Sequence, residues 1–216
     1  STASVASGTN VNFPMLVSST FATWETTSTA GGAGHIQNLV TAPNGLNEPA
    51  DLVFVTSTPT ASGANWNCGT SLNFETESYT SSTGALIDWV NVPSVSTGTV
   101  IYVCYGDSTV TTDQSHPSST WNANYTAVWH LDESSGNYND STAAANNSTA
   151  ITITSRGVAG QISKGAQATG GSDNIVVPAA SWPTSVNTGT ISAWINPTTL
   201  VGGYQGILRM DGSMTW

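Results

Sequence analysis

The sequence predicts an all-β fold made of two β-sandwich domains. Apolar and polar residues alternate with a period of two in segments spread along the 216 residues, as they do in strands with one buried face. No apolar pattern with helical spacing persists for the roughly 12 residues that a typical helix needs. The abundant Ser, Thr, Asn and Gly agree with this prediction, because these residues are poor formers of helix interiors. Turn-forming clusters separate the alternating segments at a spacing typical of a sandwich.

Two groups of expected strands stand on either side of a polar stretch. The strands of the first group are expected at 13–17, 51–56, 72–79, 85–92 and 99–105. Those of the second are expected at 127–131, 151–154, 175–177, 190–195 and 206–210. The residues between the groups are almost free of apolar side chains and include His116-Pro117, which is typical of a linker. We therefore predict a first domain over 1–107, a linker over 108–120 and a second domain over 121–216.

Several sequence motifs resemble those of two known domain families that occur in this order. The segments NFPMLV at 12–17, LNFETESY at 72–79, ALIDWVNVPSV at 85–95 and TVIYVCYGD at 99–107 resemble a domain-of-unknown-function family. Members of that family commonly lie directly before a LamG-like (concanavalin A-like lectin/glucanase) jelly roll in secreted and phage proteins. The second half resembles that jelly roll through YTAVWHLDE at 125–133, NDST at 139–142, GSDNIVV at 171–177 and GTISAWINP at 189–197. The resemblance implies a glycan-binding or adhesive role.

The resemblance also predicts that the second domain is an incomplete jelly roll. It is shorter than LamG-like domains usually are, so strand edges and one face of its core would be exposed. Two explanations stay open: the chain is a fragment of a longer polypeptide, or a neighbouring subunit supplies the missing strands.

Charge is scarce and strongly acidic. Thirteen acidic side chains face three basic ones, which gives a formal charge of −10, and charged residues make up 7% of the chain against roughly 25% in ordinary globular domains. A nucleic-acid partner held through its phosphates is not expected, because almost no cations are available to displace counterions from phosphates. Membrane insertion is not expected either, since no run approaches the roughly 18 apolar residues of a membrane helix. Neutral hydrogen-bonding side chains dominate instead, which favours an extracellular, cell-surface or virion setting.

Glu75 and Glu77 are the candidates for catalysis. They lie two residues apart on an expected strand, so both carboxyl groups point to one face, and paired carboxyl groups are the machinery of glycoside hydrolysis. A cation site or a hydrogen-bonded face explains the same pattern, and we expect no catalytic role.

A calcium site is a further hypothesis for the second domain. Four acidic residues lie in its expected loops: Asp132, Glu133, Asp140 and Asp173. Carboxylate oxygens are the ligands that Ca²⁺ prefers, and LamG-like domains often hold calcium in such loops. Asp140 and Asp173 are the best candidate ligands.

Cysteines, loop aromatics and histidines complete the candidate residues. Cys68 and Cys104 are the only cysteines, and in an extracellular domain they are expected to form a disulfide, although a buried free thiol at Cys104 is the alternative. Three aromatic residues lie in expected loops rich in Gly, Asn or Pro and could stack on sugar rings: Trp66, Trp182 and Tyr204. Trp89, Trp129 and Trp194 are expected in the core. His130 is expected to be a partly buried imidazole with satisfied hydrogen bonds rather than a catalytic base.

The sequence therefore predicts a non-enzymatic extracellular or virion-surface module for glycan binding or adhesion. Its expected partners are glycans or cell-surface and virion proteins, with self-assembly as a possibility. Two alternatives stay open. One is a structural subunit of a filament, sheath or virion that is completed by strands from neighbouring chains, and the other is a glycan-cleaving enzyme that uses Glu75 and Glu77.

Overall fold

The computed structural model describes residues 10–29, 31–42, 45–63, 65–177, 189–198 and 206–207, and it is nearly all β. The all-β prediction is confirmed. The chain forms two compact units, of which the first contains residues up to 130 together with 139–145, and the second contains 131–138 and the residues from 146 onward. Among the described residues, no helix combines the length and apolar character needed to cross a membrane.

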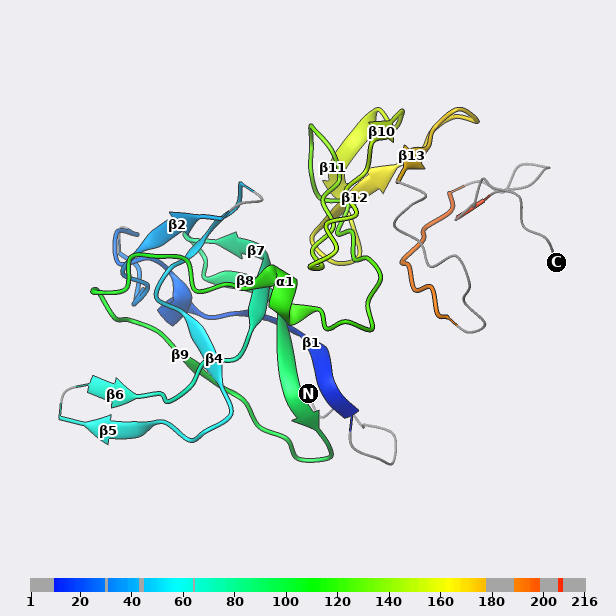
Figure 1. Cartoon of the computed structure of the whole chain (residues 1–216). Coiled ribbons are helices and arrows are strands. Elements are labelled where there is room, and N and C mark those ends of the chain that lie inside the picture. Colours follow the sequence, from blue (N-terminus) through cyan, green and yellow to red (C-terminus); the bar gives the residue numbers. More distant parts are fainter. Residues whose placement is uncertain are drawn as a thin grey trace. The chain divides into compact units, whose positions relative to one another are not determined.

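A three-stranded antiparallel sheet organises the first unit. β8 (Ala85–Val95) lies between β1 (Asn10–Thr20) and β7 (Phe74–Thr80) (Figure 1). The β7–β8 ladder is regular up to the pair Thr76↔Asp88 and resumes at Ser78↔Ile87. Glu77 is therefore the extra residue of a β-bulge, an irregularity that redirects side chains.

Shorter pairs and two helical turns surround this sheet. β2 (Leu39–Thr41) pairs with β3 (Asn47–Pro49), β4 (Val53–Val55) with β9 (Tyr102–Cys104), and β5 (Thr60–Ser62) with β6 (Asn65–Asn67). The helical turns are η1 (Ala22–Trp24) and α1 (Pro117–Thr120). The strands expected in the first 107 residues are all present with shifted ends, and β2, β3, β5 and β6 are additional.

One face of the central sheet forms the hydrophobic core. Alternation along β8 directs Leu86, Val90 and Val92 to this face, where they pack with Phe54 and Phe74. All five side chains are almost fully buried. The alternate residues of β7 and β8 point to the opposite face, and the candidate site is built there.

The predicted linker packs against the first unit. The backbone N–H of His116 donates to the carbonyl of Phe74 at 2.8 Å, and the Asn91 side chain donates to the carbonyl of Thr120 at 2.9 Å. Thr120 and Trp121 are buried. The composition of 108–120 was misleading because its polar side chains and backbone bond to the strands that they cross. The unit boundary lies beyond this stretch, next to His130.

In its described residues, the second unit contains two small antiparallel strand pairs. β10 (Ala150–Ile151) pairs with β13 (Ile175–Val176), and β11 (Ser155–Ala159) pairs with β12 (Lys164–Gln167). A fully buried Tyr138 anchors this unit, since the guanidinium of Arg156 lies 4.3 Å from its ring centroid and donates to its hydroxyl at 3.1 Å.

The second group of expected strands is only partly present. Parts of 151–154 and 175–177 form β10 and β13, whereas 127–131 contributes a single bridge, Trp129↔Asp140. Residues 190–195 form no strand, and Trp194 is 73% exposed rather than in the core. The apolar alternation there lacks a partner strand among the described residues. Most of the segment 206–210 lies outside the described residues.

Candidate functional site

A buried ionic cluster covers the outer face of β7 and β8. As expected from their spacing, Glu75 and Glu77 direct their carboxylates to the same face, and both contact one imidazole. The Oε2 atom of Glu77 lies 2.5 Å from Nδ1 of His130, and Oε2 of Glu75 lies 3.1 Å from its Nε2. Both glutamates are only 4% exposed. The bulge at Glu77 lies at the point where the two carboxylates converge.

Indole and hydroxyl groups also donate hydrogen bonds to these two carboxylates. Trp89 Nε1 donates to Glu77 at 3.0 Å, and Trp121 Nε1 donates to Glu75 at 2.6 Å. The hydroxyl of Ser141 donates to the other oxygen of Glu75 at 2.5 Å. The two indole rings pack against each other with centroids 5.2 Å apart, so the charges are enclosed by aromatic surface.

The cluster carries a positive imidazolium at neutral pH. Burial disfavours the charged ring, but hydrogen bonds to Glu75 and Glu77 and their negative charges outweigh it and raise the pKa of His130 to about 10. A protonated imidazole cannot act as a general base. Ser141 bonds to Glu75 rather than to His130, so these residues do not form a serine–histidine–acid triad. The arrangement attaches Trp121, His130 and Ser141 to the sheet.

A pocket lined by neutral polar groups lies elsewhere in the first unit. Its volume is about 480 Å³, within the range of small-molecule sites. Amides, hydroxyls and two apolar side chains line it, and no charged group does: Asn12, Asn73, Asn91, Asn122, Thr56, Thr70, Ser71, Ser119, Leu72 and Pro93. Such a lining can donate to and accept from the hydroxyls of an uncharged ligand.

A break in the β1–β8 ladder shapes one side of this pocket. The register runs from Val11↔Ser94 to Phe13↔Val92 and leaves Asn12 and Pro93 unpaired within the ladder. Pro93 has no N–H to donate, and Asn12 adopts the left-handed conformation with φ 48°, which asparagine tolerates better than most residues. The side chain of Asn122 donates to the carbonyl of Asn12 at 3.1 Å and holds the chain around Asn122 against this edge.

Of the predicted aromatic residues, the structure describes Trp66. It lies in β6, paired with Ala61 of β5, and its side chain is 67% exposed. Trp66 therefore stands on a strand rather than in a loop, and its ring is accessible for stacking. Trp182 and Tyr204 lie outside the described residues.

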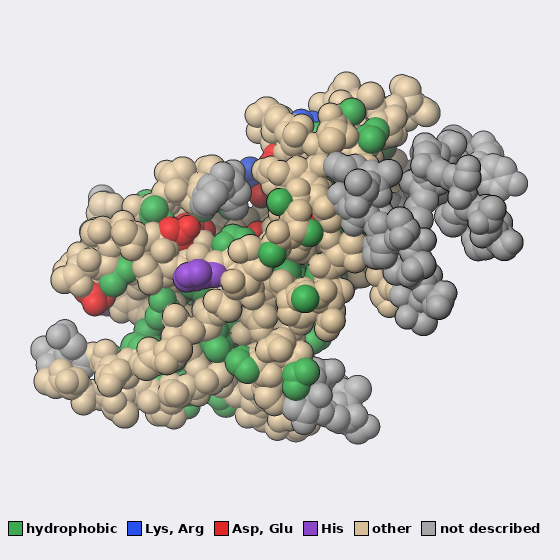
Figure 2. All heavy atoms as spheres, viewed as in Figure 1, with side chains coloured by type: hydrophobic (Ala, Val, Ile, Leu, Met, Phe, Trp, Pro, Cys, Tyr) green, Lys and Arg blue, Asp and Glu red, His purple; other side chains and the backbone are tan. Residues whose placement is uncertain are grey.

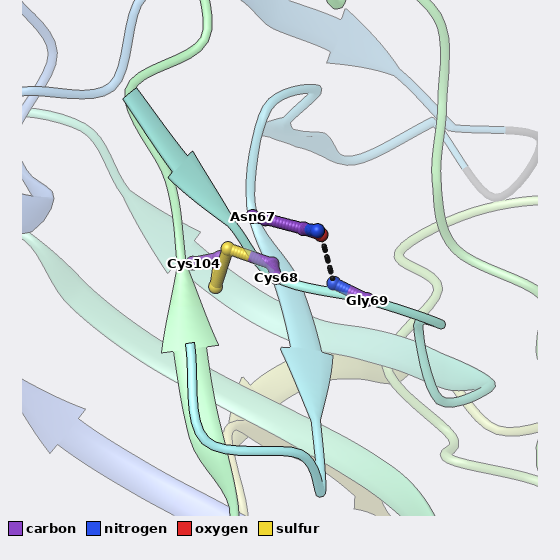
Figure 3. The surroundings of a disulfide bond; sticks show 4 residues. All are labelled: Asn67, Cys68, Gly69 and Cys104. Carbon is purple, nitrogen blue, oxygen red and sulfur yellow. Dashed lines mark hydrogen bonds between the residues drawn. A yellow bond between two sulfur atoms is a disulfide. The ribbon is translucent and has the colours of Figure 1, made fainter. Parts of the chain in front are cut away.

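The hairpin that carries Trp66 is attached to the core by a disulfide. Cys68, directly after β6, is bonded to Cys104 of β9 with their Cα atoms 6.4 Å apart (Figure 3). The backbone N–H of Gly69 donates to the Asn67 side chain at 3.1 Å and orders the turn beside the disulfide. From the sequence alone, a free thiol at Cys104 was the alternative to this disulfide. The disulfide fixes the base of the exposed hairpin.

The proposed calcium ligands are divided between the two units. Asp140 belongs to the first unit, whereas Asp132, Glu133 and Asp173 belong to the second. One oxygen of Asp140 accepts from the backbone N–H groups of Val128 and Thr142. No group of three or more acidic, histidine or cysteine residues in the described part of the chain is arranged to hold a metal ion. Calcium binding stays a prediction.

Two features of the first unit were not predicted from the sequence. The pocket combines residues from five separate segments, so no local sequence motif indicates the site. The second feature is a pair of buried acids, Glu48 and Asp88, which are 2% and 0% exposed. The burial of Asp88 could have been predicted, because the period of two in ALIDWVNV places Asp88 on the same face as Leu86 and Val90.

Comparisons with family models, curated proteins and solved structures found no match for this chain.

Proposed function

We propose that this protein is a non-enzymatic extracellular or virion-surface module that binds glycans through the neutral pocket of its first unit. The carrying observation is the pocket lining, in which four asparagines and four hydroxyl side chains surround about 480 Å³ without a single charge. Amides and hydroxyls match the alternating donors and acceptors of sugar hydroxyls. Leu72 and Pro93 supply the apolar surface that a sugar ring also requires.

The surface chemistry supports the same proposal. On the face drawn in Figure 2, uncharged polar side chains and backbone predominate, with few acidic and fewer basic groups. The exposed Trp66 offers a second, aromatic contact for an extended glycan. The burial of Glu75 and Glu77 against His130 argues against the glycan-cleaving alternative, because substrate would have to displace Trp121 and Ser141 to reach them.

The finer fold prediction is also part of this proposal. We assign a sandwich to the first unit and an incomplete LamG-like jelly roll to the second, on the motif resemblance. Support for the first assignment comes from the small β4–β9 sheet, because Phe54 of β4 packs with Phe74 of the central sheet at a centroid distance of 5.3 Å.

Glycan-array binding tests the function. The full chain is expected to bind neutral glycans saturably, and Asn73→Ala is expected to weaken binding about fivefold, the equivalent of about 1 kcal/mol for one lost hydrogen bond. Asn73 lines the pocket and is exposed, so its truncation leaves the core intact. Asn124→Ala is the matched control, since Asn124 is exposed but lies outside the pocket lining. Equal affinity of the two variants would refute the pocket assignment.

A specific observation favours a second candidate, the structural subunit. Ile191, Trp194 and Ile195 are 64%, 73% and 59% exposed on a segment with the alternation of a buried strand. Strands from a neighbouring chain would cover such residues. Analytical ultracentrifugation over a range of concentrations is expected to show self-association that Trp194→Ser reduces. A monomer at all concentrations would contradict this second candidate.

A further inference from the structure

Buried carboxyl groups without cationic partners distinguish the core of the first unit. Asp88 is fully buried on the core face of β8, and neither of its carboxyl oxygens has a hydrogen-bond partner. Glu48 of β3 is almost as deeply buried, and its Oε1 is likewise without a partner. Leaving a charged carboxylate in this state costs several kcal/mol. The structure therefore has to neutralise both groups.

The first unit itself contains no lysine or arginine that could do so. The facing elements offer Asp88 only neutral neighbours across the sheet, with Val17 on β1 and Thr76 on β7. Neither β1 nor β2 carries an ionisable side chain. A proton is the remaining means of neutralising Asp88.

Glu48 faces another acid. Its second oxygen takes part in a hydrogen bond with Asp113, and Ser115 and Thr76 also bond to it. The pKa of Asp113 is lowered in part by the nearby His116. Asp113 also accepts a hydrogen bond from the backbone N–H of Ser115 at 2.7 Å. Two carboxylates cannot share a hydrogen bond unless one of them is protonated. Glu48 is the protonated partner, since it is the more deeply buried and Asp113 receives the additional donors.

We propose that Glu48 and Asp88 form a proton-binding site inside the first unit, so that both carboxyls keep their protons through neutral pH and their loss in alkaline solution opens the core around β3 and β8. Proton affinity agrees with this geometry. Burial, followed by the contact with Asp113, raises the pKa of Glu48 to about 8. Burial raises the pKa of Asp88 to about 8 as well, and the nearby Thr76, which is not in hydrogen-bond geometry with it, offsets only part of that effect. The remaining charged groups of β7, Glu75 and Glu77, face His130 on the other side of the sheet.

The direction of the pH effect follows from linkage. A carboxyl whose folded pKa exceeds its unfolded pKa contributes stability that is complete below the unfolded value and is lost as pH rises through the folded value. For Glu48 and Asp88 this window runs from their ordinary values of 4.5 and 3.8 to about 8. His130 also binds a proton on folding, but only between 6.5 and about 10. The range from about pH 5 to about pH 6 therefore isolates the two carboxyls.

Equilibrium unfolding of the full chain in urea, at closely spaced pH values, tests the proposal. From about pH 5 to about pH 6 the unfolding equilibrium constant is expected to rise up to about 100-fold, tenfold for each proton that folding binds. Asp88→Asn or Glu48→Gln is expected to reduce the rise to about tenfold. The exposed Asp107→Asn serves as the matched control and leaves the slope unchanged. A wild-type slope equal to that of the Asp88→Asn variant would overturn the proposal.

Infrared spectroscopy of the native chain gives a readout that does not depend on the folding of any variant. At about pH 7 an ordinary carboxyl is ionised, so a carbonyl band from protonated carboxylic acid is expected only from the buried pair. Its absence would overturn the proposal. Stabilisation by added calcium that disappears in Asp88→Asn would also overturn it, because the oxygens would then hold a cation instead of protons.

Discussion

The largest predicted loss of stability comes from disrupting the ionic cluster of Glu75, Glu77 and His130. Replacing His130 by Gln leaves Glu75 and Glu77 buried at 4% exposure without a counter-charge. Removing one partner of a buried ion pair typically costs about 3–5 kcal/mol. The proton affinity leads to a similar figure, because the pKa of His130 is raised from 6.5 to about 10 and each unit corresponds to about 1.4 kcal/mol. We expect His130→Gln to lower the free energy of unfolding by about 3–5 kcal/mol near pH 6.

Urea unfolding followed by tryptophan fluorescence is a suitable assay, since Trp89 and Trp121 both donate to the cluster. The stabilisation by His130 is complete below about pH 6.5 and is lost as pH rises to about 10, so the difference between wild type and variant should shrink over that range. The exposed His35→Gln is the matched control. The triple variant Glu75→Gln, Glu77→Gln, His130→Gln should lose less than the single one, because it leaves no buried charge. A loss no larger than that of His35→Gln would refute the reasoning.

Two further predictions concern covalent and metal stabilisation. Replacing both Cys68 and Cys104 by Ala opens a loop of 36 residues and should cost about 4 kcal/mol in the chain-entropy model; an unchanged urea midpoint would contradict it. Calcium binding at Asp132, Glu133, Asp140 or Asp173 should raise the melting temperature when calcium is added and lower it in EDTA. Asp173→Asn should then lose the shift, and identical melting curves in calcium and EDTA would remove the hypothesis.

Strands of the first unit could be predicted because their signal is local. Alternation in 72–79 and 85–92 directly reflects which side chains of β7 and β8 face the core. The shared face of Glu75 and Glu77 followed from the same rule. Their partner His130 could not be predicted, since it is 55 residues from Glu75 in the sequence. The two residues come together only because the intervening polar 108–120 segment packs against the sheet.

Composition misled the prediction where polar groups are used internally. The 108–120 stretch resembled a linker, yet Thr120 is completely buried and its hydroxyl donates to the carbonyl of His116. In the second unit, apolar alternation at 190–195 predicted a strand, but a strand requires a partner that residue spacing alone does not supply. The pocket escaped prediction for a related reason, because its asparagines come together only in the folded unit.

The most direct test of the central claim is an NMR titration that follows asparagine side-chain amide signals while a neutral oligosaccharide is added. Glycan binding in the pocket predicts saturable shifts of Asn12, Asn73, Asn91 and Asn122, which line it, and little change at Asn124. Shifts confined to the Trp66 indole, or none at the pocket asparagines for any neutral glycan that binds, would contradict the account.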